Sequence, residues 1–271
     1  MTAEERLVRR FGESVRPWLA ELPDRLDRLA ADWGLTLGDP FPDGASAVTL
    51  RAERAGVQVV LKVSPDVEFA ATQAGILRAF EPSGRVPALL AEADGALLMA
   101  WIDGTEGWPE PARFAGLLAD LHAVAEPERA AWRDLRAGVA AFFPRFPPTG
   151  PVTADHLDAA WEIAQRLLDN PSRQVLLHGD LHRFNLLDTP TGLVVLDPQG
   201  TLGEPEFDAV DFVLDGPGIE ARRDALVAAS DLDPDRLDGW CRAMAPLVAV
   251  GKVRRGEPVA ELIAYSAPTS R

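Results

Sequence analysis

The chain has 271 residues, 47% of them hydrophobic and 25% charged, which is enough for one large domain or two lobes with a buried core. Its 27 basic and 42 acidic residues give a net charge of −15, which argues against nucleic acid or an anionic membrane as the main partner. One cysteine, Cys241, rules out an internal disulfide, and neither an apolar leader nor an 18-residue apolar run is found. We therefore expect a cytoplasmic protein.

The first hundred residues alternate between helical and strand-like patterns. Apolar residues first recur at the spacing of a helix face and later in short, β-branched runs separated by turn residues. In chain order, the pattern predicts helices within residues 1–36, a hairpin of strands 47–51 and 57–63, a helix over 67–80, and a buried strand over 96–101.

Beyond residue 102 the pattern is mostly helical. It predicts helices over 109–124, 131–142 and 154–168, a pair of short strands at 174–177 and 192–196, and further helices from 208 onward. We therefore predict an α+β fold of two lobes. A small β-rich N-terminal lobe covers residues 1–102, a helical lobe covers residues 103–271, and a hinge lies near 101–105.

Polar residues cluster between the two short strands of the helical lobe. Asp180 and Asn185 lie in the loop 178–185 (His-Gly-Asp-Leu-His-Arg-Phe-Asn), and Asp197 follows the second strand. This spacing matches phosphoryl transfer in the kinase fold, where the first Asp accepts the hydroxyl proton and the other two residues hold Mg²⁺. Asp and Asn are also common turn formers, but the complete spacing with apolar flanks favours catalysis.

A zinc hydrolase is an alternative, because His178, Asp180 and His182 follow one another at two-residue spacing. The chain has only four histidines and one cysteine, so zinc ligands would be scarce. His122 lies in an apolar helical run, and we interpret it as a helix-packing residue.

Lys62 lies inside an apolar strand-like run and is one of only two lysines. A charge in a buried strand needs a counter-charge, which phosphate oxygens and a helix glutamate supply in kinases. An edge-strand lysine that points into water is the simpler interpretation of Lys62 alone. Upstream, we expect the turn 43–46 to cover the phosphates, with Ser46 or backbone N–H groups touching them. Trp101 and Asp103 fit a kinase hinge whose backbone receives the adenine edge, and a plain strand end is the simpler interpretation of this segment.

These motifs resemble the aminoglycoside phosphotransferases of the streptomycin 6-phosphotransferase and hydroxyurea phosphotransferase family over nearly the whole chain. The resemblance implies a protein-kinase-like fold, ATP and Mg²⁺ as cofactors, and antibiotic resistance by phosphorylation of an aminoglycoside hydroxyl, with streptomycin as the expected acceptor. It implies that Asp180 is the catalytic base, that Asn185 and Asp197 are the metal ligands, and that Lys62 binds the α- and β-phosphates. The segments that carry it are 18–23, 33–35, 61–63, 178–185, 196–198 and 203–208.

Two positions depart from the family pattern. Gln73 stands where the family usually has the glutamate that pairs with Lys62, and Glu68, one turn earlier, could substitute. Gln199 stands where relatives often carry lysine. The first departure leaves open a nucleotide-binding, degenerate kinase without turnover, and the second leaves open another small hydroxylated acceptor.

The segment 204–215 carries five acidic residues and no basic one. Carboxylates that face a polycationic acceptor would bind its ammonium or guanidinium groups. We expect Glu204, Glu206 and Asp211 to contact the acceptor and Asp208 to brace the catalytic loop. Acids at helix N-termini or on solvated faces are the simpler interpretation. We expect a monomer whose partner is a cationic small molecule.

Overall fold

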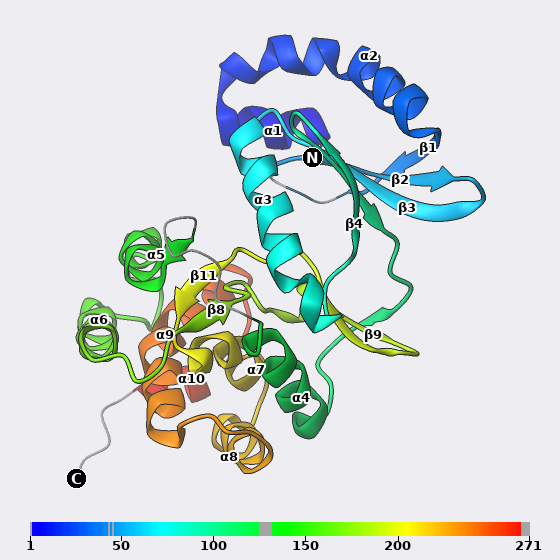
Figure 1. The fold of residues 1–271 in the computed structure, drawn as a ribbon. Helices are drawn as coiled ribbons and strands as arrows, with labels where there is room; N and C mark the ends of the chain where they lie inside the picture. Colours follow the sequence, from blue (N-terminus) through cyan, green and yellow to red (C-terminus); the bar gives the residue numbers. More distant parts are fainter. Residues whose placement is uncertain (1, 43, 45, 125–131, 267–271) are drawn as a thin grey trace. The chain divides into compact units, whose positions relative to one another are not determined.

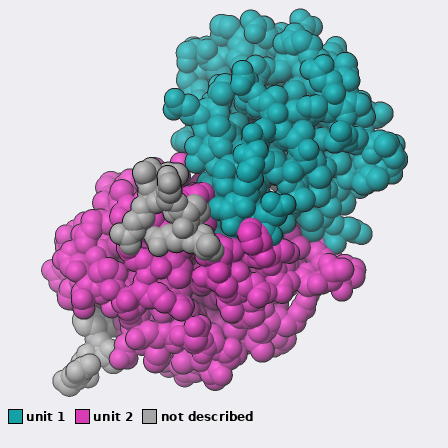
Figure 2. All heavy atoms as spheres, viewed as in Figure 1, with its two compact units in different colours: residues 1–81, 86–103 teal, residues 82–85, 104–271 magenta. Residues whose placement is uncertain are grey.

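The computed structural model describes residues 2–42, 44, 46–124 and 132–266. The chain forms two compact units, residues 1–81 with 86–103 and residues 82–85 with 104–271 (Figures 1 and 2). We call them unit 1 and unit 2. The short excursion 82–85, which belongs to unit 2, is not predicted from the sequence. Within the described residues, no helix has the length and apolar character that crossing a membrane requires.

Unit 1 is a five-stranded antiparallel sheet with three helices, and its strand order is β1-β2-β3-β5-β4 (Figure 1). Its elements are α1 (Ala3–Phe11), α2 (Arg16–Trp33), β1 (Leu35–Pro40), β2 (Val48–Arg54), β3 (Val57–Val63), α3 (Val67–Phe80), β4 (Leu89–Ala93) and β5 (Ala96–Ala100). The observed α3 has the bounds that the sequence predicts.

Helices α1 and α2 cover one face of this sheet. Thr2 and Glu5 form a capping box that starts α1, and Gly34 in the left-handed region ends α2. Buried Leu7 and Leu29 pack against inward-facing residues of β2, β3 and β5, including Leu61. Because neighbouring residues of a strand point to opposite faces, Lys62 lies on the other face, where α3 packs against β4 and β5.

Unit 2 is helical, with two three-stranded sheets of short strands. One sheet has the order β10-β9-β6, and the other has the order β7-β11-β8. Its helices are α4 (Pro111–His122), α5 (Leu135–Phe142), α6 (Ala154–Asp169), α7 (Val210–Leu214), α8 (Ile219–Ala229), α9 (Pro234–Arg254) and α10 (Ala260–Ser266). Its strands are β6 (Thr105–Glu106), β7 (Arg133–Asp134), β8 (Val175–Leu177), β9 (Leu186–Thr189), β10 (Gly192–Val195) and β11 (Thr201–Gly203).

The two short strands that the sequence predicts around the loop 178–185 do not pair with each other. β8 pairs with β11, whereas β10 pairs with β9 through a tight turn. β9 follows the catalytic loop directly, and only Leu186 of its four residues is fully buried. The sequence does not predict β9, because the apolar pattern of this strand is weak.

Helix α9 packs against α6, α7 and α10 and buries ten of its residues, so it forms the centre of the helical core.

The β2–β3 hairpin generates the first prediction. Both turn residues, Ala55 (φ 52°) and Gly56 (φ 82°), have positive φ, which Asn tolerates better than Ala. We expect Ala55→Asn to raise the free energy of unfolding by about 0.5–1 kcal/mol, measured by urea denaturation. Gly56→Ala is the matched control and should lower it, although its new methyl group meets no atom within 4 Å. A lower urea midpoint for Ala55→Asn would contradict this account.

Candidate active site

A buried carboxylate holds the start of the loop 178–185, the predicted catalytic loop. Asp208 accepts hydrogen bonds from the backbone N–H groups of His178 and Gly179, both at 2.8 Å, and its Oδ2 lies 3.0 Å from His122 Nε2. Burial alone would raise the pKa of Asp208, but the hydrogen bond with His122, together with nearby His178 and Gly179, lowers it below its usual value. Asp208 thus braces the loop, and His122 supports that brace instead of serving only as a packing residue.

The ring of His178 links the loop to the segment that carries Asp197. His178 is fully buried, its Nε2 donates to the carbonyl oxygen of Leu196 at 2.9 Å, and its Nδ1 accepts from the backbone N–H of Asp180 at 3.3 Å. Burial lowers the pKa of His178, so the ring is neutral. Both ring nitrogens are therefore engaged within the protein.

This engagement argues against the zinc alternative. Neither nitrogen of His178 is available to a metal ion. Within the residues that the structure describes, no group of three or more His, Cys, Asp and Glu side chains is arranged to hold one. Structural and catalytic zinc sites use at least three such ligands. Mg²⁺ needs fewer protein ligands, because it usually keeps several waters and binds substrate phosphates.

Asp180 is exposed in the loop that Asn185 closes. The Asn185 side-chain amide donates to the backbone carbonyl of Asp180 at 2.9 Å, and its backbone N–H donates to His182 at 2.9 Å. The Asp180 side chain is 48% exposed, and its Oδ2 lies 3.9 Å from His182 Nε2. A hydroxyl group can therefore reach this carboxylate. Because the Asn185 Nδ2 points back into the loop, its Oδ1 is left for a cation.

Leu196 connects the two predicted metal ligands. Its N–H donates to the carbonyl of Asn185 at 2.8 Å, and Asp197 is the next residue. Asp197 is exposed and has φ 51°, an uncommon conformation for a non-glycine residue that is often kept at functional sites. The Gln199 side chain donates to the Asp197 carbonyl at 3.2 Å. An amide oxygen and a carboxylate are the kinds of ligand that a hard divalent cation prefers.

In unit 1, Lys62 lies on β3 opposite the α1–α2 core, with its Nζ 6.0 Å from the centre of the Phe69 ring of α3. On the same helix, Gln73 is buried and Glu68 is exposed in the first turn. Helix α3 therefore presents the Gln73 amide, and not the Glu68 carboxylate, to the interior of unit 1. The contact of Lys62 with phosphate stays a prediction.

The predicted nucleotide turn is only partly described. Asp43 and Ala45 lie outside the described residues. The carbonyl oxygen of Ser46 accepts a hydrogen bond from Ser64 Oγ at 2.7 Å, which fixes the end of the turn at the edge of β2. Trp101 follows β5, and Asp103 ends unit 1 with an exposed side chain. Their predicted contacts with a nucleotide stay predictions.

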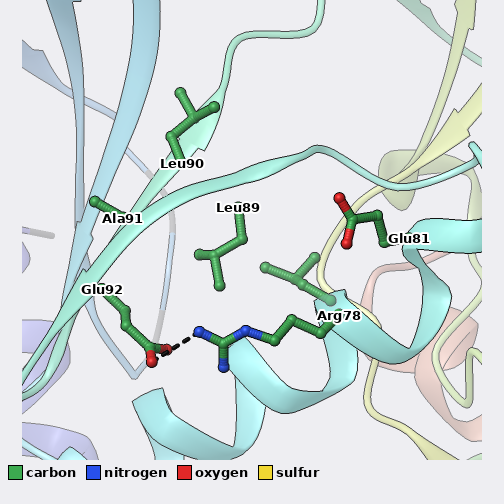
Figure 3. Close-up of a pocket in the computed structure, with 7 residues that line it drawn as sticks. Arg78, Glu81, Leu89, Leu90, Ala91 and Glu92 are labelled. Atoms are coloured by element: carbon green, nitrogen blue, oxygen red, sulfur yellow. Dashed lines mark ion pairs between the residues drawn. The ribbon is translucent and has the colours of Figure 1, made fainter.

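Two cavities lie away from these residues. One, of about 230 Å³, lies between α3 and β4 in unit 1, where Arg78 forms a 2.7 Å ion pair with Glu92 (Figure 3). The other, of about 190 Å³, lies in unit 2 beside Trp240. Neither cavity is lined by any of the predicted catalytic, metal or phosphate residues. The site is therefore defined by its side chains and not by these hollows.

The family described as aminoglycoside/hydroxyurea antibiotic resistance kinase matches residues 35–256. The chain belongs to this family. The sequence-based resemblance is thus confirmed, and the protein is a phosphotransferase that acts on hydroxyl groups.

Individual proteins agree with this assignment. The chain is 28% identical to a streptomycin 6-kinase of Streptomyces glaucescens, covering 83% of this chain and 75% of that protein. It is also 28% identical to a hydroxyurea phosphotransferase of Kitasatospora aureofaciens, covering 92% of this chain and 78% of that protein. A solved aminoglycoside phosphotransferase, in complex with ADP and hygromycin B, superposes with a TM-score of 0.64 at 13% identity, covering 90% of this chain and 99% of that one. This likeness confirms the two-lobe, protein-kinase-like fold.

Glu204 lies inside unit 2, where its carboxylate binds other residues of the protein. Its carboxylate is 2% exposed and accepts hydrogen bonds from Trp240 Nε1 at 2.8 Å, Arg236 Nη2 at 2.7 Å and the N–H of Ser172 at 2.7 Å. These partners come from α9 and from the segment before β8. The expected contact of Glu204 with an acceptor does not fit this burial, and we correct it.

Glu206 is also buried, at 3% exposure. One carboxylate oxygen accepts from the N–H of Asp233 at 3.0 Å, and the other has no hydrogen-bond partner among the described residues. Burial, together with nearby Glu204, raises the pKa of Glu206. The expected contact of Glu206 with the acceptor does not fit this burial either, because the carboxylate binds the N-cap residue of α9.

The remaining acids of the segment differ in their partners. Asp215 accepts from Trp108 Nε1 at 3.0 Å and lies 3.6 Å from Arg183 Nε and 3.9 Å from Lys252 Nζ. Asp211 has no basic partner among the described residues. Burial and the neighbouring carboxylates of Asp180, Asp215 and Asp208 raise the pKa of Asp211 to about 7. Of the three predicted acceptor residues, only Asp211 is electrostatically coupled to Asp180.

The two buried glutamates generate the second prediction. Glu204→Gln should lower the free energy of unfolding by about 2–3 kcal/mol, because it leaves the Arg236 guanidinium without its charge partner. Glu206→Gln should not lower it at pH 8. The pKa of Glu206 is raised in the folded state, so ionising this carboxyl costs folding stability once the pH exceeds the ordinary pKa of a glutamate. Glutamine cannot ionise and therefore removes that cost.

Urea denaturation of both variants and the parent at pH 5 and pH 8 checks this prediction. The parent should lose stability between these pH values relative to Glu206→Gln, because glutamine cannot ionise. Equal losses from the two substitutions at pH 8 would show that the two carboxylates have the same role, against the contacts described above.

Proposed function

We propose that this chain transfers the γ-phosphoryl group of a nucleoside triphosphate, with ATP as the first donor to test, to a hydroxyl group of an aminoglycoside, with streptomycin as the first acceptor to test. The observation that carries the proposal is the exposed Asp180 carboxylate in a loop tied to Asn185 and, through Leu196, to Asp197. Phosphoryl transfer needs little more than a carboxylate beside the nucleophile and ligands for a metal.

Each residue then has a defined task. Asp180 orients the acceptor hydroxyl and accepts its proton as the new bond to phosphorus forms. Asn185 and Asp197 would hold Mg²⁺, which neutralises charge on the phosphates when bound. Lys62 binds the α- and β-phosphates, Ser46 contacts the phosphates from the turn, and the backbone from Trp101 to Asp103 receives the base.

Asp211 is the residue of unit 2 that we assign to the cationic acceptor. A carboxylate without a basic partner attracts an ammonium or guanidinium group more strongly than one that already has an ion pair. The streptomycin 6-kinase relative supports an aminoglycoside acceptor.

The hydroxyurea phosphotransferase relative, at the same identity over more of the chain, supports a small uncharged hydroxylated acceptor as the second candidate. A degenerate kinase without turnover rests on Gln73 alone. The exposed, supported Asp180 weighs against it.

The third prediction concerns Asp180. Asp180→Asn should lower kcat by about 10²–10⁴ because the proton acceptor is removed, whereas the affinity for nucleotide should change little. The measurement is the mass gain of streptomycin by one phosphoryl group after incubation with enzyme, ATP and Mg²⁺, followed over time. Asp158→Asn, an exposed acid on α6, is the matched control. An unchanged kcat for Asp180→Asn would remove the catalytic assignment.

The fourth prediction concerns the pH dependence of acceptor binding. Asp211 is neutral below about pH 7 and charged above it, whereas a guanidinium acceptor stays charged throughout. The KM for streptomycin should therefore fall by up to about tenfold from pH 6 to pH 8, as the carboxylate deprotonates. Asp211→Asn should hold the KM high and nearly independent of pH.

Glu220→Gln, an exposed acid on α8, should keep the KM profile of the parent enzyme. Hydroxyurea carries no charge to attract, so its KM should show no such fall. A KM profile for streptomycin that Asp211→Asn leaves unchanged would exclude Asp211 from the acceptor site.

A further inference from the structure

Two aromatic rings and a guanidinium form a cluster in unit 1. The Phe41 and Trp101 rings are stacked, with centroids 6.1 Å apart and planes inclined by 22°. The central carbon of the Arg51 guanidinium lies 5.3 Å from the Phe41 centroid and 5.6 Å from the Trp101 centroid. The three separations are nearly equal, so the guanidinium lies over both rings and not between them. We call these three residues the Phe41–Arg51–Trp101 cluster.

The strand register places this cluster on the Lys62 face of the sheet. Thr49 pairs with Lys62, and Arg51 pairs with Val60, so these residues share one face. Val60 in turn pairs with Met99 of β5, two residues before Trp101. The opposite face is filled by the α1–α2 core. The cluster and the predicted phosphate-binding lysine therefore lie on the same side of unit 1.

The Arg51 donors are available to a ligand. The side chain is exposed, and within the described part of the chain no carboxylate forms an ion pair with it. A guanidinium has five N–H donors and no acceptor, so it recognises groups that present acceptors side by side. Aromatic faces, by contrast, stack on any nucleobase. The two rings can thus stack on any nucleobase, whereas the Arg51 guanidinium can distinguish one base from another by its acceptors.

We propose that the Phe41–Arg51–Trp101 cluster is a purine-base subsite in which Arg51 makes GTP bind at least as tightly as ATP. Guanine presents two neighbouring acceptors, O6 and N7, which match an arginine in a bidentate contact. Adenine presents N7 beside the N6 amino group, which is a donor and opposes a second arginine N–H. This inference rests on the proposed function and goes beyond it by defining how the phosphoryl donor is selected.

The test is calorimetric titration of the full chain, with Mg²⁺ present, by GTP, ATP and ITP. ITP keeps O6 and N7 but lacks the 2-amino group of guanine. We expect GTP and ITP to bind at least as tightly as ATP. Arg51→Met keeps an apolar stem but removes the donors, so it should weaken GTP and ITP about tenfold and ATP much less.

Two further variants serve as controls. Arg54→Met removes another exposed arginine of β2, three residues away and on the opposite face, and should leave all three affinities unchanged. Trp101→Leu should weaken the binding of GTP and of ATP alike, because it removes a stacking surface and leaves the Arg51 guanidinium in place. Urea denaturation of Arg51→Met should match the parent, since the residue is exposed.

The outcomes separate this inference from the proposed function. Tighter binding of ATP than of GTP in the parent, or an unchanged GTP-to-ATP affinity ratio in Arg51→Met, would overturn the role of Arg51 while leaving a working kinase. A parent chain that binds none of the three nucleotides and phosphorylates no acceptor would overturn both.

Discussion

The buried carboxylate of Asp208 fixes the start of the catalytic loop, and the geometry of the site in unit 2 depends on it. Asp208 accepts hydrogen bonds from the backbone N–H groups of His178 and Gly179, and these bonds orient the chain just before Asp180. Gly179 adopts φ 80°, and a side chain there would meet Thr201 at 2.9 Å, so the turn needs glycine at this position. An isolated buried charge would be costly, but here three hydrogen-bond donors, one of them His122, compensate it.

From this brace, hydrogen bonds extend to each group that chemistry requires. The His178 ring contacts both the Asp180 backbone and Leu196, and Leu196 contacts Asn185 and precedes Asp197. Because these bonds involve the backbone, they fix the loop but leave the carboxylate of Asp180 exposed. A site of this kind is preorganised before substrate binds, so little of the binding free energy is needed to order it.

The sequence singled out the loop 178–185 because the chemistry of phosphoryl transfer requires particular residue types at fixed spacing along one short segment. It did not separate the acids of segment 204–215, since their partners come from distant positions such as Arg236, His122 and Lys252. Glu204 and Asp211 look equivalent in sequence, yet one is a buried ion-pair partner and the other has no basic partner among the described residues. Burial and long-range pairing decide such roles, and a local pattern contains neither.

The same reasoning explains why the sequence does not reveal the partners of β8 and β10 or the Phe41–Arg51–Trp101 cluster. Strand patterns predict that β2, β3 and β5 exist, but only the register shows that Arg51 shares a face with Lys62. A one-residue shift of β2 would turn Arg51 toward the α1–α2 core, where a guanidinium would be buried without a partner. The apolar residues Val48, Leu50 and Ala52 must face that core. Hydrophobic burial on one face of the sheet thus determines which polar groups the other face presents to a ligand.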